Sequence, residues 1–598
     1  MKRLFIAALF MLLLPTFPKA QVVEKKVSWK TLNERGYPQW FSDARLGIFV
    51  HWGLYSVPAY ASKEGYAEWF YRGLMLKDSG RCQIMSLYAD TTLPVFEQYK
   101  TLTNYWHAEL WNPAEWARLF KEAGAGYVVL VTKHHDGYCL WDSPQQPEWN
   151  SVASGPRRNI VEELTKAVRR EGLRMGFYYS LPEWSNPRHI WMEDPDNKIG
   201  DYVDNYMVPQ FKELVSRYRP SLIFADGDWQ NTAEQFRSEE LIDWYYNTVG
   251  ADAIVNDRWG NGTQHGFKTP EYSAGINVTG RPWAECRGLG RSFGYNRNED
   301  LDNYLTDGEL IRHFCELVAN GGGLTLNVGP YADGTIPLIQ QERLRALGRW
   351  LEVNGEAIYG SEPPSDRSRC ERVKAIGLFR QGNAMMPETE SIDYDWVRNA
   401  PLKNMPVDDF TIMWQGTVVA PSDGNYTFKV EGNDEIMVVC DGKDTMLYYN
   451  SSWAENDRAQ KTLRLKKGKR LNFEVFFHEK ELEASASLKW SFNGGAFVPV
   501  PAKWQGTARW RQWKYNVTRR GDAEYYILYE RPELSYTIED LPPLSPDAVV
   551  TLLGTTGTLQ WKQDEGGNVT IDFSTVNPSE FNALNHAWVV KISGLWKD

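Results

Sequence analysis

The chain has 598 residues, a formal net charge of −11 and an aromatic content of 14%, including 26 Trp. This length exceeds what one hydrophobic core can hold, so roughly two to four domains are expected. The acidic balance argues against nucleic acid or an anionic membrane as a partner. The six Cys are far apart and form no CxxC motif, so the sequence predicts no disulfide scaffold and no particular pairing.

The N-terminus has the pattern of a secretory signal peptide. Residues 1–3 are basic, residues 4–15 are almost wholly apolar, and Ala20 precedes Gln21. The apolar run is too short to span a bilayer, and no Cys follows that would suggest a lipid anchor. We therefore expect residues 1–20 to be removed and the mature protein to be soluble, exported to the periplasm or the extracellular space, and without a membrane span.

Residues 21–370 alternate between apolar runs and helical patterns. The apolar runs predict buried strands at 46–50, 127–132, 173–180, 222–225, 253–255 and 323–328, with an extended piece at 267–272. Helical spacing predicts helices at 114–123, 160–170, 201–218, 239–248, 307–319 and 337–353. This alternation favours a parallel α/β fold and, at this length, a (β/α)8-type barrel.

The C-terminal part of the chain has a different character. After about residue 370, short alternating runs such as 410–414, 426–430 and 471–476 are separated by turns, which predicts an all-β sandwich over 371–503. A second all-β stretch, with runs at 549–553 and 588–592, predicts another sandwich over 504–598. The expected architecture is thus a barrel followed by two β-sandwiches.

Polar side chains gather at the ends of the predicted barrel strands. They are His51, His134, His135, Tyr178, Asp226, Arg258 and Glu271. In parallel barrels the carboxyl ends of the strands converge on one mouth, where active sites lie.

Asp226 follows the apolar run 222–225 directly and needs compensation if it is ionised there. Taken alone, it could equally cap the next helix or turn. Paired carboxylates at a barrel mouth suit glycoside hydrolysis, in which one attacks the anomeric carbon and a protonated partner donates to the leaving oxygen. Asp226, near Phe224, and Glu271, beside Pro270, have the apolar neighbours that such a pair needs. Asp228 is a weaker candidate for the nucleophile.

Eight strings carry a resemblance to a known family: LGIFVHWG, AEWF, TKHHDGYCLWDS, GFYYS, VNDRWG, FKTPEY, RGLGRSFGYNRNE and GGGLTLNVGP. Over residues 27–365 and the C-terminal sandwich, the sequence resembles the α-L-fucosidases of glycoside hydrolase family 29. The resemblance implies a retaining exo-α-L-fucosidase that acts on fucosylated oligosaccharides or glycoconjugates and uses no cofactor or metal. It implies Asp226 as nucleophile and Glu271 as acid/base. The implied fucose pocket comprises His51, Glu68, Trp69, His134, His135, Tyr178, Arg258 and Phe293.

Two departures from the family pattern affect these expectations. Phe224 and Ala225 stand where the family often has Trp and Asn before the nucleophile, so one wall of the pocket is altered. The family commonly has Trp-Glu before the RG-x-G-x-SFGYN string, whereas this chain has Trp283-Ala284-Glu285-Cys286. Glu285 is therefore the alternative acid/base.

Residues 371–503 resemble the protective-antigen-type (PA14) module, through the string DDFTIMWQGTVVAPSDGNYTFKVEGNDEIMVVCDGK and a later ASLKWSF. The module interrupts the usual passage from barrel to C-terminal sandwich. It could bind glycans, shape the rim of the pocket or act as a spacer. No dense Asp cluster supports a calcium site in it.

Two other functions stay open at the level of the sequence. His51, His134 and His135 could serve a metal-dependent barrel hydrolase, and a barrel without chemistry could be a fucose-binding protein. Trp69 and Phe293, taken alone, read as core residues. Linkage preference, natural glycan and oligomeric state do not follow from the sequence.

Overall fold

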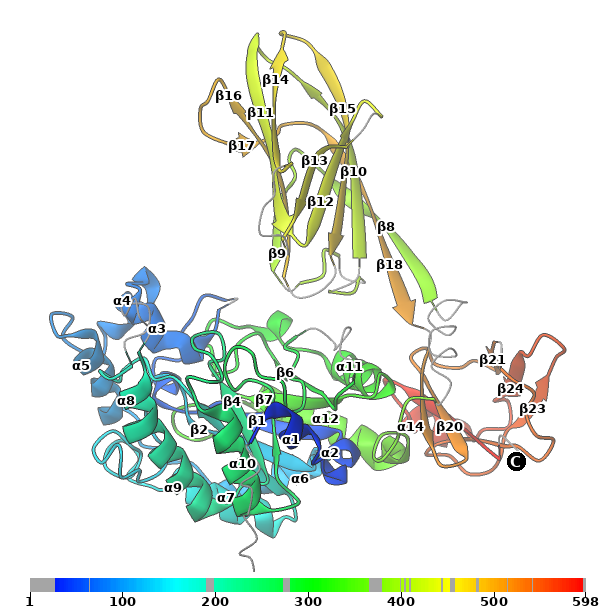
Figure 1. Cartoon of the computed structure of the whole chain (residues 1–598). Coiled ribbons are helices and arrows are strands. Elements are labelled where there is room, and N and C mark those ends of the chain that lie inside the picture. The colour runs from blue at the N-terminus through cyan, green and yellow to red at the C-terminus, as the bar shows by residue number, and fades with distance from the viewer. Residues whose placement is uncertain are drawn as a thin grey trace, which may run out of the picture.

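A computed structural model describes residues 27–63, 65–189, 198–272, 280–364, 379–397, 399–402, 405–407, 410–442, 445–451, 458–479, 483–513, 515–539 and 541–594. The predicted signal peptide, residues 1–20, lies outside these ranges. Figure 1 shows an α/β body, a β-sandwich that stands off from it, and a smaller β domain beside the body.

The body is built on one parallel sheet with the strand order β5-β4-β3-β2-β1-β7-β6. Nearly every residue of these strands is buried, as expected for runs that helices cover on one side and a barrel interior on the other. The strands are β1 (Leu46–Val50), β2 (Tyr127–Lys133), β3 (Arg174–Ser180), β4 (Leu222–Asp226), β5 (Ile254–Val255), β6 (Ala284–Gly288) and β7 (Gly323–Val328).

An irregular segment, residues 267–271, closes the sheet between β5 and β6. The Phe267 N–H donates to the Val255 carbonyl at 3.0 Å on one side. On the other side, the Cys286 N–H donates to the Pro270 carbonyl at 2.9 Å. Pro270 has no N–H of its own, which limits regular strand pairing here. The predicted barrel class is confirmed, with seven regular strands and this closing segment in the eighth position.

Helices surround the sheet and agree closely with the sequence pattern. They are α6 (Pro113–Glu122), α7 (Ile160–Arg170), α10 (Ser238–Val249), α11 (Asp307–Ala319) and α12 (Leu338–Asn354). The predicted helix 201–218 is divided into α8 (Gly200–Tyr202), a π-helical turn η4 (Val203–Met207) and α9 (Val208–Tyr218). Within the described residues, no helix is long and apolar enough to cross a bilayer.

Short helices line the N-terminal part of the body and its loops. The α-helices are α1 (Trp29–Asn33), α2 (Gln39–Ala44), α3 (Phe70–Met75), α4 (Ser79–Met85) and α5 (Val95–Lys100). The 3₁₀ turns are η1 (Leu54–Ser56), η2 (Ala67–Trp69), η3 (Thr101–Asn104), η5 (Leu301–Asn303) and η6 (Gly355–Ala357). The sequence pattern had assigned no helix to α3, α4 or α5.

The projecting sandwich has a core of its own, separate from that of the body. One sheet has the order β13-β12-β15-β10-β18-β8, and the other has the order β14-β11-β16-β17 with β9 beside β16. The strands are β8 (Phe379–Thr389), β9 (Asp393–Val397), β10 (Phe410–Val419), β11 (Gly424–Asn433), β12 (Glu435–Cys440), β13 (Thr445–Asn450), β14 (Gln460–Leu465), β15 (Arg470–Glu479), β16 (Ala484–Phe492), β17 (Val498–Pro499) and β18 (Trp504–Trp513).

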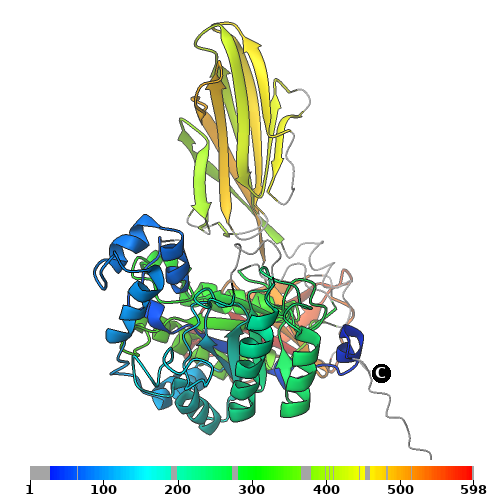
Figure 2. The ribbon, with the colours of Figure 1, turned by 60° about the vertical axis from the view of Figure 1, so that its left-hand side comes forward.

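The first and last strands of this sandwich, β8 and β18, pair antiparallel from Trp504↔Thr389 to Trp513↔Phe379. They form the two-stranded connection between the sandwich and the body in Figures 1 and 2. The boundary expected from the sequence, between residues 503 and 504, falls at the start of β18. By its pairing, β18 belongs to the projecting sandwich rather than to the C-terminal domain.

The C-terminal domain packs directly on the body. Its larger sheet has the order β19-β20-β25-β22 and its smaller sheet the order β21-β24-β23. On β20, Tyr525 and Ile527 belong to the core of the body, whereas Tyr526 and Leu528 belong to the core of the domain. This alternation is that of a strand with two buried faces. The elements are β19 (Tyr515–Arg520), β20 (Ala523–Leu528), β21 (Ser535–Ile538), β22 (Val549–Leu552), β23 (Gln560–Gln563), β24 (Val569–Asp572), α14 (Pro578–Ala583) and β25 (Trp588–Ser593).

Candidate active site

Asp226 is the last residue of β4, and the chain turns sharply immediately after it. Gly227 has a φ of +96°, and a Cβ built on it would lie 2.3 Å from the Pro182 side chain. Only glycine fits both the left-handed backbone and the close approach. The strand therefore ends at a defined point, with the Asp226 carboxyl at the mouth of the barrel.

Three groups compensate the Asp226 carboxylate. The Tyr178 hydroxyl donates to Oδ2 at 2.8 Å, His135 Nε2 lies 3.4 Å from the same oxygen, and Arg258 Nη1 lies 3.3 Å from Oδ1. Burial raises the pKa of Asp226, but the contacts with His135, Arg258 and Tyr178 outweigh it and hold this pKa well below its usual range. The carboxylate is thus ionised although Asp226 is buried.

Arg258 connects Asp226 to Glu271. Its Nη2 lies 3.2 Å from Glu271 Oε2, while Nη1 contacts Asp226. The guanidinium is held in place because Nε donates to Thr269 Oγ1 and Nη2 donates to the Thr269 carbonyl, both at 3.0 Å. Since the guanidinium is small, planar and rigid, two carboxylates that contact its two ends face one another across a short gap.

Glu271 lies on the closing segment of the barrel. The Tyr66 hydroxyl donates to Glu271 Oε1 at 2.7 Å. The next residue, Tyr272, has a left-handed backbone with a φ of +53°. Its hydroxyl donates to the Arg291 carbonyl at 2.7 Å and accepts the Gly288 N–H at 3.0 Å. These bonds hold a backbone conformation that non-glycine residues seldom adopt and so fix the end of the segment.

The structure does not bring the alternative acid, Glu285, into this group. Glu285 precedes Cys286 on β6, and successive side chains of a strand point to opposite faces. Cys286 Sγ lies 3.5 Å from Arg258, whereas Glu285 Oε1 lies 2.6 Å from His313 Nε2 of α11, in the helical layer. Asp228, the alternative nucleophile, is half-buried, and burial raises its pKa, the opposite of the shift at Asp226.

The three histidines form one cluster at the ends of β1 and β2. Burial lowers the pKa of His51 to about 3 and lowers that of His134 well below its usual value, so both imidazoles are neutral. His51 Nδ1 lies 2.6 Å from Asn327 Oδ1, and His135 Nδ1 lies 2.5 Å from Ser180 Oγ. Neutral imidazoles can donate and accept hydrogen bonds with sugar hydroxyls. In the described chain, no three His, Cys, Asp or Glu side chains are arranged to hold a metal ion.

Glu68, Trp69 and Phe293 complete the set that the resemblance implied. Glu68 Oε2 accepts the Gly294 N–H at 2.8 Å, and burial raises the pKa of Glu68 to about 7. The Phe293 ring lies 4.9 Å from the His51 ring. Trp69 is half-buried, and its ring lies 6.1 Å from that of His135. All ten residues that the resemblance implied for the site, which do not include the alternative acid Glu285, therefore gather around the barrel mouth.

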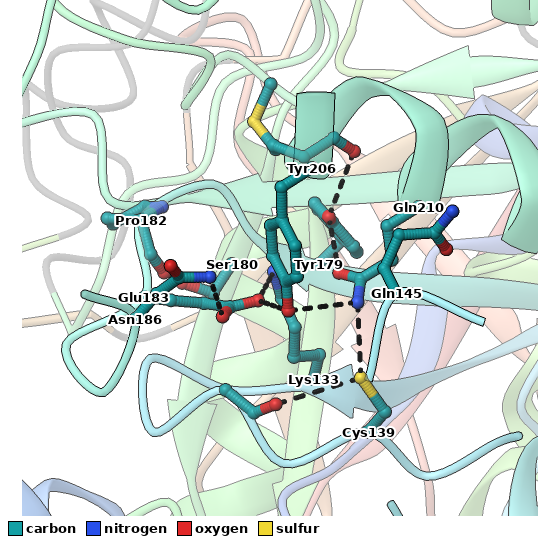
Figure 3. Close-up of polar contacts among 12 residues, drawn as sticks. Lys133, Cys139, Gln145, Tyr179, Ser180, Pro182, Glu183, Asn186, Tyr206 and Gln210 are labelled. Carbon is teal, nitrogen blue, oxygen red and sulfur yellow. Dashed lines mark hydrogen bonds and ion pairs between the residues drawn. The ribbon is translucent and has the colours of Figure 1, made fainter. Parts of the chain in front are cut away.

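A buried ion pair behind the histidines was missed from the sequence. Lys133 Nζ lies 2.7 Å from Glu183 Oε1, and both side chains are fully buried. The Tyr206 hydroxyl donates to Glu183 Oε1 at 2.8 Å, and Asn186 Nδ2 donates to Oε2 at 3.1 Å (Figure 3). The Lys133 ammonium also lies 4.0 Å from the centre of the Tyr179 ring. A lysine that ends an apolar strand run was the available signal, because a buried charge requires a partner.

This ion pair joins two chain segments that hold His135. Lys133 ends β2, two residues before His135, and Glu183 follows β3. The backbone N–H of the neighbouring Trp184 donates to the His135 carbonyl at 2.7 Å, and the Ser180 hydroxyl contacts the His135 ring. The pair therefore ties the strand end that carries His135 to the loop that supports it.

Comparison with known proteins agrees with this geometry. The family model described as alpha-L-fucosidase matches residues 14–356, and the PA14 domain model matches residues 381–504. An α-L-fucosidase of Dictyostelium discoideum is 39% identical over 370 residues, which cover 60% of this chain and 78% of that protein. Human tissue α-L-fucosidase is 38% identical over 342 residues, which cover 56% and 72%.

Solved structures give the same result for the fold. The crystal structure of an α-fucosidase of Thermotoga maritima, in complex with a mechanism-based inhibitor, is 27% identical with a TM-score of 0.62. The match covers 95% of this chain and 99% of that one.

A parallel barrel with two carboxylates bridged by one arginine at its mouth fits the class of glycoside hydrolases. Within that class, the chain belongs to the α-L-fucosidase family, since the family model spans more than half of it. The predicted family and the predicted PA14 domain are both confirmed. The role of the PA14 domain stays a prediction.

Proposed function

We propose that the protein is an exported, retaining exo-α-L-fucosidase that releases terminal α-L-fucose by double displacement. The observation that carries this proposal is the bridge from Asp226 through Arg258 to Glu271, which places two carboxyl groups on one small cation. Retaining enzymes need their two carboxyl groups about 5 Å apart, closer than inverting enzymes do.

In the first step, the Asp226 carboxylate attacks the anomeric carbon and the bond to the leaving oxygen breaks. Glu271 donates its proton to that oxygen, and a fucosyl-enzyme forms on Asp226. In the second step, Glu271 takes a proton from water, the water oxygen attacks the anomeric carbon, and the bond to Asp226 breaks. The low pKa of Asp226 supports the nucleophile role, because that carboxyl must be ionised throughout the working pH range.

The remaining pocket residues fit the two faces of fucose. We assign the binding of hydroxyls to His51, His134, His135, Tyr178 and Arg258. Glu68, with a pKa of about 7, is neutral below that pH and can then donate a hydrogen bond to a hydroxyl. We assign the apolar face with the methyl group to Trp69 and Phe293.

The stereochemistry of the first product tests the mechanism. ¹H NMR during early hydrolysis of an aryl α-L-fucoside should show α-L-fucose first, with the β-anomer appearing only by mutarotation. If β-L-fucose appears first, the enzyme inverts and the double displacement is refuted.

Export is tested separately by expressing the full chain in a Gram-negative host. We expect a periplasmic or secreted protein whose N-terminal residue is Gln21. A cytoplasmic product that keeps residues 1–20 would contradict export and leave the mechanism unaffected.

A further inference from the structure

Trp229 is an exposed aromatic residue in the turn that follows Asp226. Trp229 is 47% exposed, three positions beyond the buried end of β4. The centre of the Trp229 ring lies 6.1 Å from that of Trp69 at an interplanar angle of 25°, and 5.4 Å from that of His135 at 76°. Trp229 thus extends the aromatic wall of the pocket outward toward solvent.

The position of Trp229 relates it to the sugar beyond fucose. His135 contacts the Asp226 carboxylate at 3.4 Å, and Trp229 packs on the side of His135. If fucose is bound among the buried residues, the sugar linked to it extends toward the opening, where Trp229 is exposed. One face of the Trp229 ring is stacked toward Trp69, so exposed ring surface is left for this unit.

The next residue, Gln230, adds hydrogen-bonding capacity to the same turn. Gln230 is buried, and neither its side-chain nitrogen nor its side-chain oxygen has a hydrogen-bond partner in the described chain. Buried amides are normally paired, so each exception calls for an explanation. The turn after Asp226 thus combines an exposed aromatic ring with an unsatisfied amide.

We propose that Trp229 is the binding platform for the hexopyranose that carries the fucose, and so a residue that determines which glycans are cleaved. This inference rests on the proposed fucosidase function. A hexopyranose presents C–H groups on a ring face, and these pack against an indole. An interaction with the departing sugar lowers the barrier only for substrates that have such a sugar.

The test compares two substrates that share fucose and differ in the leaving group. α-L-Fucosyl fluoride has no second ring, whereas a fucosyl-α1,2-lactose trisaccharide presents a hexopyranose to Trp229. We expect Trp229→Ala to lower the ratio of kcat/KM for the trisaccharide to kcat/KM for the fluoride about tenfold. Trp229→Phe, which keeps a ring, should lower the ratio less.

The control is Tyr105→Ala, which removes an aromatic residue that is also exposed, at 49%, but packs on Tyr88 and on none of the site residues named above. This variant should leave the ratio unchanged. An equal fall for both substrates in Trp229→Ala, or no fall in the ratio, would overturn the inference. Wild-type enzyme that fails to hydrolyse the fluoride would instead refute the proposed function itself.

Discussion

The two sides of the candidate site are built differently. Asp226 ends a regular central strand, and its side chain is 11% exposed, whereas Glu271 stands on the irregular closing segment with a side chain that is 28% exposed. Asp226 contacts Tyr178, His135 and Arg258 from three elements. Glu271 receives its hydrogen bonds from Tyr66 and Arg258.

The difference matches the two kinds of chemistry. A nucleophile must stay ionised and be fixed in one position, which a buried strand end with several donors provides. An acid/base exchanges its proton with the leaving group and then with water, so it must stand nearer the opening. The Arg258 side chain contacts both carboxylates and therefore couples the two sides.

The largest effect is expected from removing the nucleophile. Asp226→Gly should lower kcat on an aryl fucoside on the order of 10⁵-fold, because no other group forms the covalent intermediate. The matched control is Asp228→Asn, two residues away, which should keep most of the activity. Comparable losses in the two variants would mean that the turn, and not the Asp226 carboxylate, is what matters.

Substitution of the two candidate acids, Glu271 and Glu285, should have clearly different effects on kcat/KM. Glu271→Gln should lower kcat/KM about 10²- to 10⁴-fold on substrates with poor leaving groups and much less on those with good ones. Glu285→Gln keeps a group that can contact His313 and should lower kcat/KM only slightly on either kind of substrate. A steep dependence on the leaving group in Glu285→Gln, with none in Glu271→Gln, would reverse the assignment.

Breaking the coupling between the two sides should have an intermediate effect. Arg258→Met should lower kcat about 10²- to 10³-fold, as is typical when a charge-stabilising group is lost. Arg258 is among the groups that lower the pKa of Asp226. Its loss raises that pKa, so the acidic limb of the pH–rate profile should move to higher pH.

Arg258→Lys is the matched control, because it keeps the charge but cannot contact both carboxylates in the same way. It should move the acidic limb less than Arg258→Met does. An unmoved acidic limb in Arg258→Met would contradict the assignment of this cation to Asp226.

The smallest effect on activity is expected from breaking the buried Lys133–Glu183 ion pair, which supports His135 beside Asp226. Glu183→Gln removes the anion that pairs with Lys133, and a resulting shift of His135 should lower kcat by a factor of about 10 to 100. Tyr206→Phe removes one hydrogen bond to Glu183 and keeps the ion pair, so kcat should fall less than it does in Glu183→Gln. If Glu183→Gln unfolds at a lower temperature but keeps the wild-type kcat, the pair is structural alone.

Much of this arrangement followed from the sequence. The period of apolar residues located α7 and α11 to the residue, because amphipathic helices with strong caps leave a clear pattern. Asp226 stood out because a carboxylate after a buried run needs compensation, although the run alone fitted a capping role equally well and the role of nucleophile came from the family resemblance. The closing segment was predicted as an extended piece at 267–272, but not its irregularity, since residues 267–271 are held by isolated bridges and include Pro270.

Other features depend on contacts that a linear pattern does not contain. Whether Glu271 or Glu285 faces Asp226 depends on the register of β6, which places Cys286 inward and Glu285 toward α11. The Lys133–Glu183 pair joins residues 50 positions apart. The extent of β18 beyond residue 503 became visible only through its pairing with β8.

The most direct test of the central claim is the configuration of the azide product that rescues each variant. With sodium azide and an activated aryl fucoside, Asp226→Gly should yield β-L-fucosyl azide, because azide attacks the free face in place of the carboxylate. Glu271→Ala should yield α-L-fucosyl azide, because azide attacks the fucosyl-enzyme on Asp226. Products of the opposite configuration, or a fucosyl azide of one configuration from both variants, would contradict the assignment of the two carboxyl groups.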